Sequence, residues 1–251
     1  MTGRKAQLAS LAGKKVLITG AARHIGREIA LSMAAAGADV AITYLQSRSE
    51  AEALGSDLKR QGSKGIALRC DVRDERSVLK AVARTVGELG GLDVLVNNAA
   101  LYETVELERL TVAQWDEMFN TNVRGPFLVS RACAAHLKKS KGRIINLGSL
   151  GGVRPWVTHA HYCQSKAALH MQTQLLAKAY APEIAVNCVA PGMIDLQEKP
   201  AGEFLRKIAK KTPMQRNGTS ADVAAAVMFF ATAPHFITGQ IVLVDGGLSL
   251  A

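Results

Sequence analysis

Short apolar runs alternate with longer stretches of helical periodicity along almost the whole chain. The run Val16-Leu17-Ile18 contains no polar residue, as is typical of a strand buried on both faces of a sheet. Residues 75–88 instead repeat apolar side chains at the spacing of one helix face. This alternation predicts an α/β fold, a Rossmann-type doubly wound parallel sheet of about seven strands with helices on both faces.

The predicted elements follow one another without a repeat or a linker. Strands are expected at residues 16–18, 40–44, 66–70, 92–96, 143–147, 184–189 and 240–244, and helices at 25–36, 49–61, 75–88, 112–137, 162–180 and 221–231. The 112–137 helix is expected to break near Gly125-Pro126. We expect residues 1–13 to form a flexible N-terminal lead and residues 14–251 a single domain, with a lid-like segment at 193–218.

The composition argues against several classes of protein. With 251 residues, of which 48% are hydrophobic, the chain can bury one sizeable core. No apolar run reaches the roughly 18 residues of a membrane span, and the first fifteen residues lack the apolar stretch of a signal peptide. The four cysteines are scattered without a Cys-x-x-Cys pair, so we expect a reduced, cytoplasmic protein with no disulfide framework and no metal site.

The formal net charge is +10, which can indicate nucleic acid, anionic lipid or an acidic ligand. The chain has no long Lys/Arg run, no interleaving of basic and aromatic residues, and only 5% aromatic residues. We therefore expect no nucleic-acid or membrane partner, and a small ligand that carries phosphates.

A glycine-containing turn joins the first predicted strand to the first predicted helix. It reads Thr19-Gly20-Ala21-Ala22-Arg23-His24-Ile25-Gly26. Such a turn brings backbone N–H groups and the positive end of the helix onto a pyrophosphate. Because the strand, turn and helix occur in the required order, the sequence predicts a nucleotide-binding site here.

A second group of residues carries chemistry. Tyr162 precedes Lys166 by four residues, so the two side chains share one face of the 162–180 helix. A nearby ammonium group favours the ionised phenol and lowers the tyrosine pKa from its ordinary value of about 10. Ser149, thirteen residues before Tyr162, could hold a reacting oxygen beside that phenol. These spacings suit proton-coupled hydride transfer to or from a carbonyl group.

Together with Asn122 and the 19–26 turn, these residues resemble the short-chain dehydrogenase/reductase family, from about Lys14 to the C-terminus. The resemblance implies that Tyr162 donates the proton in reduction, while Lys166 lowers its pKa and holds the nicotinamide ribose. It implies that Ser149 hydrogen-bonds the substrate oxygen, and that Asn122 bends its helix and holds a water connecting Lys166 to solvent. The chain is therefore expected to be an enzyme. The alternative from another class is a nucleotide-sensing regulator on the same fold.

The resemblance also implies where the cofactor lies. Asp71 and Val72 are expected beside the adenine, and the small residues after the fourth strand beside the ribose. His24 stands where the family pattern has its middle glycine. The expected cofactor-binding residues are Gly20, Arg23, His24, Ile25, Ser47, Arg48, Asp71, Val72, Asn98, Ala99, Ala100, Tyr162, Lys166, Pro191, Gly192 and Ile194.

The end of the second predicted strand favours NADP(H) over NAD. NAD users commonly place an acidic residue there to hold the ribose 2′-hydroxyl, and residues 44–48 contain none. Two arginines, Arg23 and Arg48, with the hydroxyl of Ser47, suit a 2′-phosphate instead. The alternative is that Arg48 only covers a solvated helix face.

Candidates for the substrate pocket follow the strand ends that carry the catalytic residues. Gly151 and His161 stand next to these candidates in the sequence. The expected pocket residues are Tyr102, Leu150, Arg154, Trp156, His159 and Met193. Arg154 and the histidines favour an anionic or heteroaromatic substrate. We predict NADPH-dependent reduction of a carbonyl, or of a related C=N or C=C group.

Two narrower activities stay open. The chain resembles 3-oxoacyl-carrier-protein reductases over most of its length, with Leu128 and Glu183 where those enzymes tend to present arginines. It also resembles pteridine reductases, which place a stacking ring where Tyr102 stands and usually an aspartate where Ser149 stands. The predicted 112–137 and 162–180 helices are richer in apolar residues than one sheet face requires, so we expect a homotetramer, or a homodimer.

Overall fold

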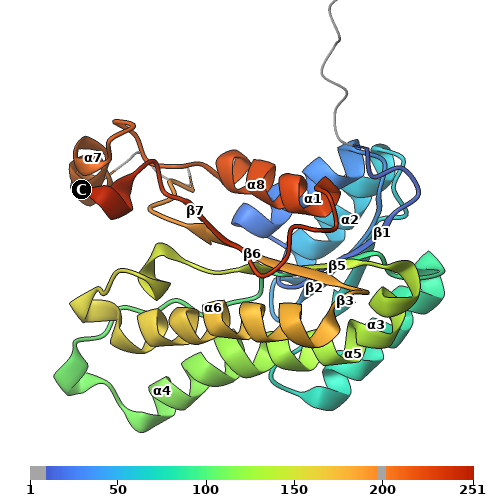
Figure 1. Cartoon of the computed structure of the whole chain (residues 1–251), viewed down its shortest axis with the longest axis horizontal. Helices are drawn as coiled ribbons and strands as arrows, with labels where there is room; N and C mark the ends of the chain where they lie inside the picture. The colour runs from blue at the N-terminus through green and yellow to red at the C-terminus, as the bar shows by residue number, and fades with distance from the viewer. Residues whose placement is uncertain (1–9, 197–201) are drawn as a thin grey trace, which may run out of the picture.

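Seven parallel strands form the central sheet of the computed structural model, which describes residues 10–196 and 202–251. Their order across the sheet is β3-β2-β1-β4-β5-β6-β7 (Figure 1). The strands are β1 Lys15–Ile18, β2 Asp39–Tyr44, β3 Ile66–Arg69, β4 Val94–Asn97, β5 Arg143–Leu147, β6 Ala185–Pro191 and β7 Ile241–Val244. The predicted doubly wound α/β fold is confirmed.

Helices cover both faces of this sheet (Figure 1). On one face lie α1 His24–Ala35, α2 Arg48–Arg60 and α8 Ser220–Thr232, and on the other α3 Glu75–Leu89, α5 Gly125–Ser140 and α6 Ala160–Tyr180. Val16 and Ile18 pack into the first layer and Leu17 into the second, because successive side chains of a strand point to opposite faces. Two covered faces explain why the β1 run contains no polar residue.

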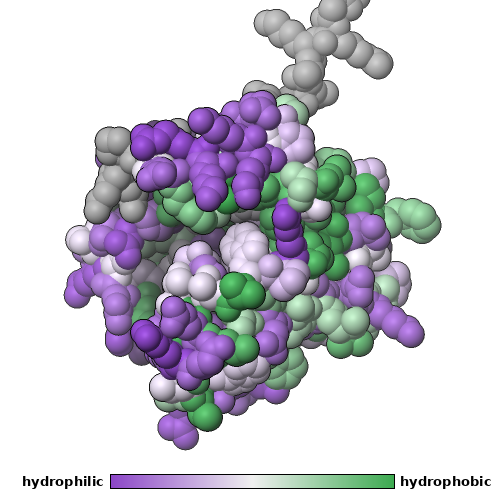
Figure 2. Space-filling model, turned by 90° about the vertical axis from the view of Figure 1, so that its left-hand side faces the viewer, coloured by the Kyte–Doolittle hydropathy of each residue, from purple (hydrophilic) through white to green (hydrophobic). Residues whose placement is uncertain are grey.

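The strand order reverses direction at β1, which lies between β2 and β4. The connections that leave β1 and β4 therefore cross to opposite faces and open a crevice at the carboxyl ends of these strands. Figure 2 shows the side of the molecule that carries α7 Glu203–Lys211 and the first turn of α6, and this side is hollowed between its upper and lower rims.

The predicted 112–137 helix is interrupted, as expected, but just upstream of the expected position. Helix α4 spans Val112–Phe119, a π-helical turn η2 spans Asn120–Arg124, and α5 follows directly. Pro126 lies in the first turn of α5, where a missing N–H costs no helix bond, so the proline begins the helix rather than breaking it. Inserted π turns are frequent at functional sites.

Short turns and the C-terminal segments complete the described chain. The 3₁₀ turns are η1 Leu107–Arg109, η3 Leu150–Gly152, η4 Val157–His159 and η5 Leu248–Leu250. Most of the expected flexible lead, and residues 197–201 of the expected lid-like segment, lie outside the described residues. Within residues 10–196 and 202–251, no helix is both long and apolar enough to cross a membrane.

Candidate active site

A cavity of about 680 Å³ opens at the carboxyl ends of β1, β2, β3 and β4. It is lined by many of the residues predicted to bind the cofactor, namely Gly20, Arg23, His24, Ile25, Ser47, Asp71, Val72, Asn98, Ala99 and Ala100. Pro191, Gly192 and Ile194 lie at the end of β6, outside this wall. The structure thus brings most of the predicted set to one crevice.

The glycine turn after β1 needs its glycines because it packs closely against the segment after β4. Gly20 has φ +61, and a Cβ there would lie 2.7 Å from Cα of Ala99. A Cβ on Gly26 would lie 2.6 Å from Nδ2 of Asn98. Asn98 also donates from Nδ2 to the carbonyls of Thr19 and Gly20 at 2.9 and 2.8 Å. The turn is therefore braced by the segment after β4, and α1 begins directly after it at His24.

His24 occupies the turn with φ +55, in the left-handed region that favours glycine. This geometry explains why the family pattern has glycine at that position. A side chain there adds an imidazole to the cavity wall beside Arg23.

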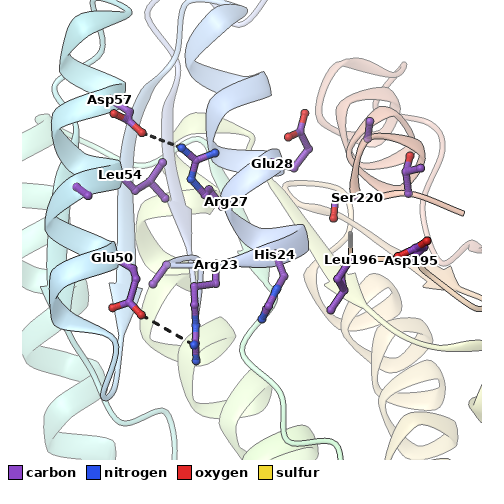
Figure 3. Close-up of a pocket in the computed structure, with 14 residues that line it drawn as sticks. Arg23, His24, Arg27, Glu28, Glu50, Leu54, Asp57, Asp195, Leu196 and Ser220 are labelled. Carbon is purple, nitrogen blue, oxygen red and sulfur yellow. Dashed lines mark hydrogen bonds and ion pairs between the residues drawn. The ribbon is translucent and has the colours of Figure 1, made fainter. Parts of the chain in front are cut away.

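Arg23 at the cavity wall and Arg27, one helical turn further along α1, are paired with carboxylates from α2 (Figure 3). Nη1 of Arg23 lies 3.9 Å from Oε1 of Glu50, and Nη2 of Arg27 lies 2.8 Å from Oδ2 of Asp57. These four side chains and His24 border a second hollow of about 670 Å³ that adjoins the first. Glu50 and Arg27 could not be predicted in this role, because their positions depend on how α2 packs beside α1.

Arg48, predicted to join Arg23 and Ser47 at a 2′-phosphate, lies outside the cavity wall that those two residues line. Arg48 starts α2 and donates from Nε to Oε1 of Glu52 at 2.7 Å, one helical turn away. Its side chain is 76% exposed, as the alternative of a solvated helix face expects. Ser47 does line the cavity, and its side chain caps no backbone N–H of α2.

Asp71 forms an ion pair with Arg73, a residue that was not predicted to belong to the site. Nε and Nη2 of Arg73 donate to its two carboxylate oxygens at 2.9 and 2.8 Å. Hydrogen bonding from the Arg73 side chain lowers the pKa of Asp71 against the opposing effect of burial. Arg73 also lines the cavity, so this end of the wall presents an ion pair rather than a lone carboxylate.

The chemical end lies where α6 meets the segment after β5. Nζ of Lys166 lies 5.7 Å from the ring centroid of Tyr162, and it donates to the carbonyl of Leu147 at 2.8 Å. Lys166 is only 3% exposed, and this burial lowers its pKa to about 8. The expected sharing of one helix face by Tyr162 and Lys166 is observed.

The expected lowering of the Tyr162 pKa is not found. Burial raises the pKa of Tyr162 to about 12, and a hydrogen bond with Ser149 opposes this rise without overcoming it. The phenol is consequently protonated at neutral pH, which is the form that a proton donor needs.

Asn122 joins three elements beneath Tyr162. It is fully buried at the centre of the π turn, accepting from the N–H of Leu101 at 2.7 Å and donating to the carbonyl of Leu101 at 2.9 Å. It also donates to Oγ of Ser165 at 3.1 Å, and that hydroxyl donates to the carbonyl of Tyr162 at 2.7 Å. The π turn thus fastens the segment after β4 to the first turns of α6.

An aromatic cluster borders the phenol of Tyr162. The Tyr102 ring meets it edge-on at 4.9 Å and 88°, and stacks on His159 at 4.9 Å and 28°. Trp156 meets His159 edge-on at 5.7 Å. Thr104 and Thr158, which the sequence reasoning missed, hydrogen-bond the two nitrogens of His159, each at 2.9 Å.

Two predicted pocket residues do not reach this cluster. Leu150 is fully buried in the η3 turn, so it supports the segment after Ser149 from within the core. Arg154 donates from Nη1 to the carbonyl of Leu248, so it ties η3 to the C-terminal turn. Met193 is half-buried after β6, and its carbonyl accepts from the N–H of Gly218.

The fold and this arrangement define the class of protein, a dinucleotide-binding oxidoreductase. A family model described as Enoyl-(Acyl carrier protein) reductase matches residues 20–249. The chain belongs to the short-chain dehydrogenase/reductase family, as its sequence predicted.

Curated relatives are similar to the chain over nearly its whole length. The chain is 36% identical over 240 residues to the 3-oxoacyl-[acyl-carrier-protein] reductase FabG of Staphylococcus aureus, covering 94% of this chain and 98% of the relative. It is 34% identical over 247 residues to the 3-oxoacyl-[acyl-carrier-protein] reductase of a Synechocystis species, covering 96% and 99%.

Solved structures are similar to the chain over nearly its whole length as well. A short-chain dehydrogenase of Burkholderia cenocepacia in complex with NADP is 40% identical, with a TM-score of 0.89 over 95% of this chain and 98% of that one. A short-chain dehydrogenase/reductase of Serratia marcescens is 36% identical, with a TM-score of 0.90 over 95% and 99%.

Proposed function

We propose that the chain reduces a carbonyl group by hydride transfer from NADPH, with Tyr162 as the proton donor. The observation that carries this proposal is the buried arrangement of Tyr162, Ser149 and Lys166, which adjoins the cavity through the Tyr102 ring. The substrate oxygen receives hydrogen bonds from Ser149 and Tyr162. The carbonyl carbon gains the hydride, and the oxygen gains the phenolic proton of Tyr162.

The residues present fit a dinucleotide. The close contacts of Gly20 with Ala99 and of Gly26 with Asn98 give the tight strand-turn-helix packing on which a pyrophosphate site is built. Bound in the crevice, the dihydronicotinamide supplies the hydride. Lys166, through its ammonium group, holds the ribose and stabilises the negative charge that remains on Tyr162 after proton transfer.

The choice of NADPH rests on the residues after β2. That strand ends without an acidic residue, and the guanidinium of Arg23 lies with the Ser47 hydroxyl at the cavity wall. The related Burkholderia structure holds NADP. We assign binding of the 2′-phosphate to Arg23 and Ser47, without Arg48. The phosphate must then compete with Glu50 for the Arg23 guanidinium.

The first substrate to test is a 3-oxoacyl thioester, because the curated relatives carry that activity in their names. A flat heteroaromatic substrate such as dihydrobiopterin is the second candidate, because the exposed ring of Tyr102 stands directly beside Tyr162.

The test is NADPH oxidation against a panel of acetoacetyl thioester, dihydrobiopterin, diketones, quinones and aromatic aldehydes. The proposal expects turnover of at least one class, lost in Tyr162→Phe while NADPH binding persists. Binding of NADPH with no turnover across the panel would favour the nucleotide-sensing alternative.

We also propose a homotetramer in the cytoplasm. Large apolar side chains are exposed on α5 and α6, such as Phe127, Met171 and Leu175, and others near β7, such as Phe229 and Leu250. Two such faces suit two kinds of two-fold contact. Sedimentation as a monomer at micromolar concentration would reject this assembly.

A further inference from the structure

A histidine lies directly behind the chemical end of the site. Tyr162, Lys166 and His170 follow one another at intervals of four residues, so they line one face of α6. His170 is 5% exposed, and nothing in the proposed reaction uses it.

The His170 ring fills a slot in the segment that carries Ser149. A Cβ on Gly148 would lie 2.4 Å from its Nε2, and a Cβ on Gly152 would lie 2.5 Å from its Cε1. Neither position can carry a side chain while the ring stays where it is. The two glycines therefore form a slot that matches the imidazole.

The ring also makes a long hydrogen bond. Nε2 of His170 accepts from the backbone N–H of Ser149 at 3.4 Å. An accepting Nε2 requires the neutral ring with its proton on Nδ1. Burial, followed by the charge of Lys166, lowers the pKa of His170 to about 4, so the ring is neutral at ordinary pH.

The segment is consequently fastened to α6 at two points. Lys166 donates to the carbonyl of Leu147, and His170 accepts from the N–H of Ser149, two residues further along. Between the two fastenings, Gly148 donates from its N–H to the carbonyl of Val189 at 2.8 Å. On the far side of Ser149, its Oγ accepts from the N–H of Gly151 at 3.0 Å. The orientation of the serine hydroxyl toward Tyr162 thus depends on how this segment seats on α6.

We propose that His170 is a positioning residue, whose neutral ring holds the 147–152 segment on α6 and so aims the Ser149 hydroxyl at the reacting oxygen. This inference rests on the carbonyl reduction proposed above, and it adds a residue that never touches the substrate.

The experiment compares His170→Leu, His170→Gln and Ser149→Ala, alone and as the Ser149→Ala/His170→Leu double variant. Leucine keeps bulk without an acceptor, and glutamine can offer an amide oxygen to the Ser149 N–H. Since small misplacements of a catalytic group are costly, His170→Leu is expected to lower kcat roughly 10- to 100-fold. The kcat of His170→Gln should lie between those of the wild type and His170→Leu. The dissociation constant for NADPH should change by no more than about twofold, because the phosphate cradle is untouched.

The double variant separates positioning from general support. If His170 acts through Ser149, adding His170→Leu to Ser149→Ala should lower kcat little further. Equal fold-losses in both backgrounds, or no loss in His170→Leu, would overturn the proposal. His235→Leu serves as the matched control, because that histidine bonds the carbonyl of Gly142 at the opposite end of β5.

A readout without turnover keeps the two proposals separable. Nitrogen NMR of the histidine rings in the wild-type protein should show His170 neutral, with Nδ1 protonated and Nε2 bare. A proton on Nε2 would overturn the positioning role, even if His170→Leu fails to fold. Absence of wild-type turnover would count against the carbonyl reduction alone, and the ring tautomer would still decide the contact.

Discussion

The two ends of the site are built on opposite principles. At the chemical end, Lys166, Asn122 and Ser149 are almost fully buried, and each is held by backbone or neutral partners. At the phosphate end, Arg23 and Arg27 lie in partly open hollows and pair with Glu50 and Asp57 (Figure 3). The first end is held together by the protein alone, whereas in the proposed complex Arg23 would exchange Glu50 for the 2′-phosphate.

This contrast predicts which substitutions should have the largest effects. A buried group without its partner keeps the cost of lost solvation, so substitutions at the chemical end should have large effects. Exposed ion pairs are worth little because water screens them, so substitutions at the phosphate end should act mainly through ligand choice.

The largest effect is expected from Tyr162→Phe. Removing the phenolic proton should cost at least about 2–3 kcal/mol of transition-state stabilisation, measured from kcat/KM, with NADPH binding kept. The phenylalanine ring keeps the contact with Tyr102, so thermal stability should hold. Wild-type turnover in this variant would contradict the assignment of the proton donor.

Lys166 should set an alkaline limit. Its pKa of about 8 means that the ammonium charge is lost as pH rises past that value. We expect kcat/KM for NADPH, which reports the free enzyme, to fall above about pH 8. Lys166→Met should have a much lower kcat/KM, and its pH profile should lack this alkaline fall. The same alkaline limb surviving in Lys166→Met would assign it to another group.

The lysine also links pH to stability. Because its folded pKa is lowered from 10.5 to about 8, the unfolded chain binds more protons between these values. The free energy of unfolding should therefore rise with pH across that window relative to Lys166→Met. Denaturant titrations at both ends of the window measure the difference, and parallel curves for the two proteins would refute it.

A smaller effect is expected at the phosphate end. Arg23→Ala should weaken NADPH binding by about tenfold, as one lost charge-assisted contact would, and leave NADH binding nearly unchanged. Glu50→Ala should act in the opposite direction, because it frees Arg23 from its carboxylate partner. Equal losses for NADPH and NADH in Arg23→Ala would show that this arginine does not choose between them.

The smallest effect is expected from Arg48→Ala, which serves as the matched control for Arg23→Ala. Arg48 is exposed and paired with Glu52, so NADPH binding should change by no more than about twofold. A loss as large as that of Arg23→Ala would restore Arg48 to the 2′-phosphate site.

The same contrast explains what the sequence could predict. Spacing along one helix places Tyr162 and Lys166 together whatever surrounds them, and an apolar run such as 16–18 is typical of a buried strand. Partners such as Glu50 for Arg23 depend on how separate elements pack, which no local pattern contains. His170 was missed although its spacing from Lys166 repeats that of Lys166 from Tyr162; its meaning appears only with the Gly148 and Gly152 slot.

The most direct test follows deuterium from labelled NADPH into a reduced product. Wild-type protein and Tyr162→Phe would be given NADPH deuterated at the transferring position, together with the substrate panel, and the products analysed by mass spectrometry. We expect a deuterated alcohol from the wild type and almost none from Tyr162→Phe, although both bind NADPH equally. Equal labelling by the two proteins, or no labelled product from the wild type despite bound NADPH, would overturn hydride transfer from NADPH with Tyr162 as the proton donor.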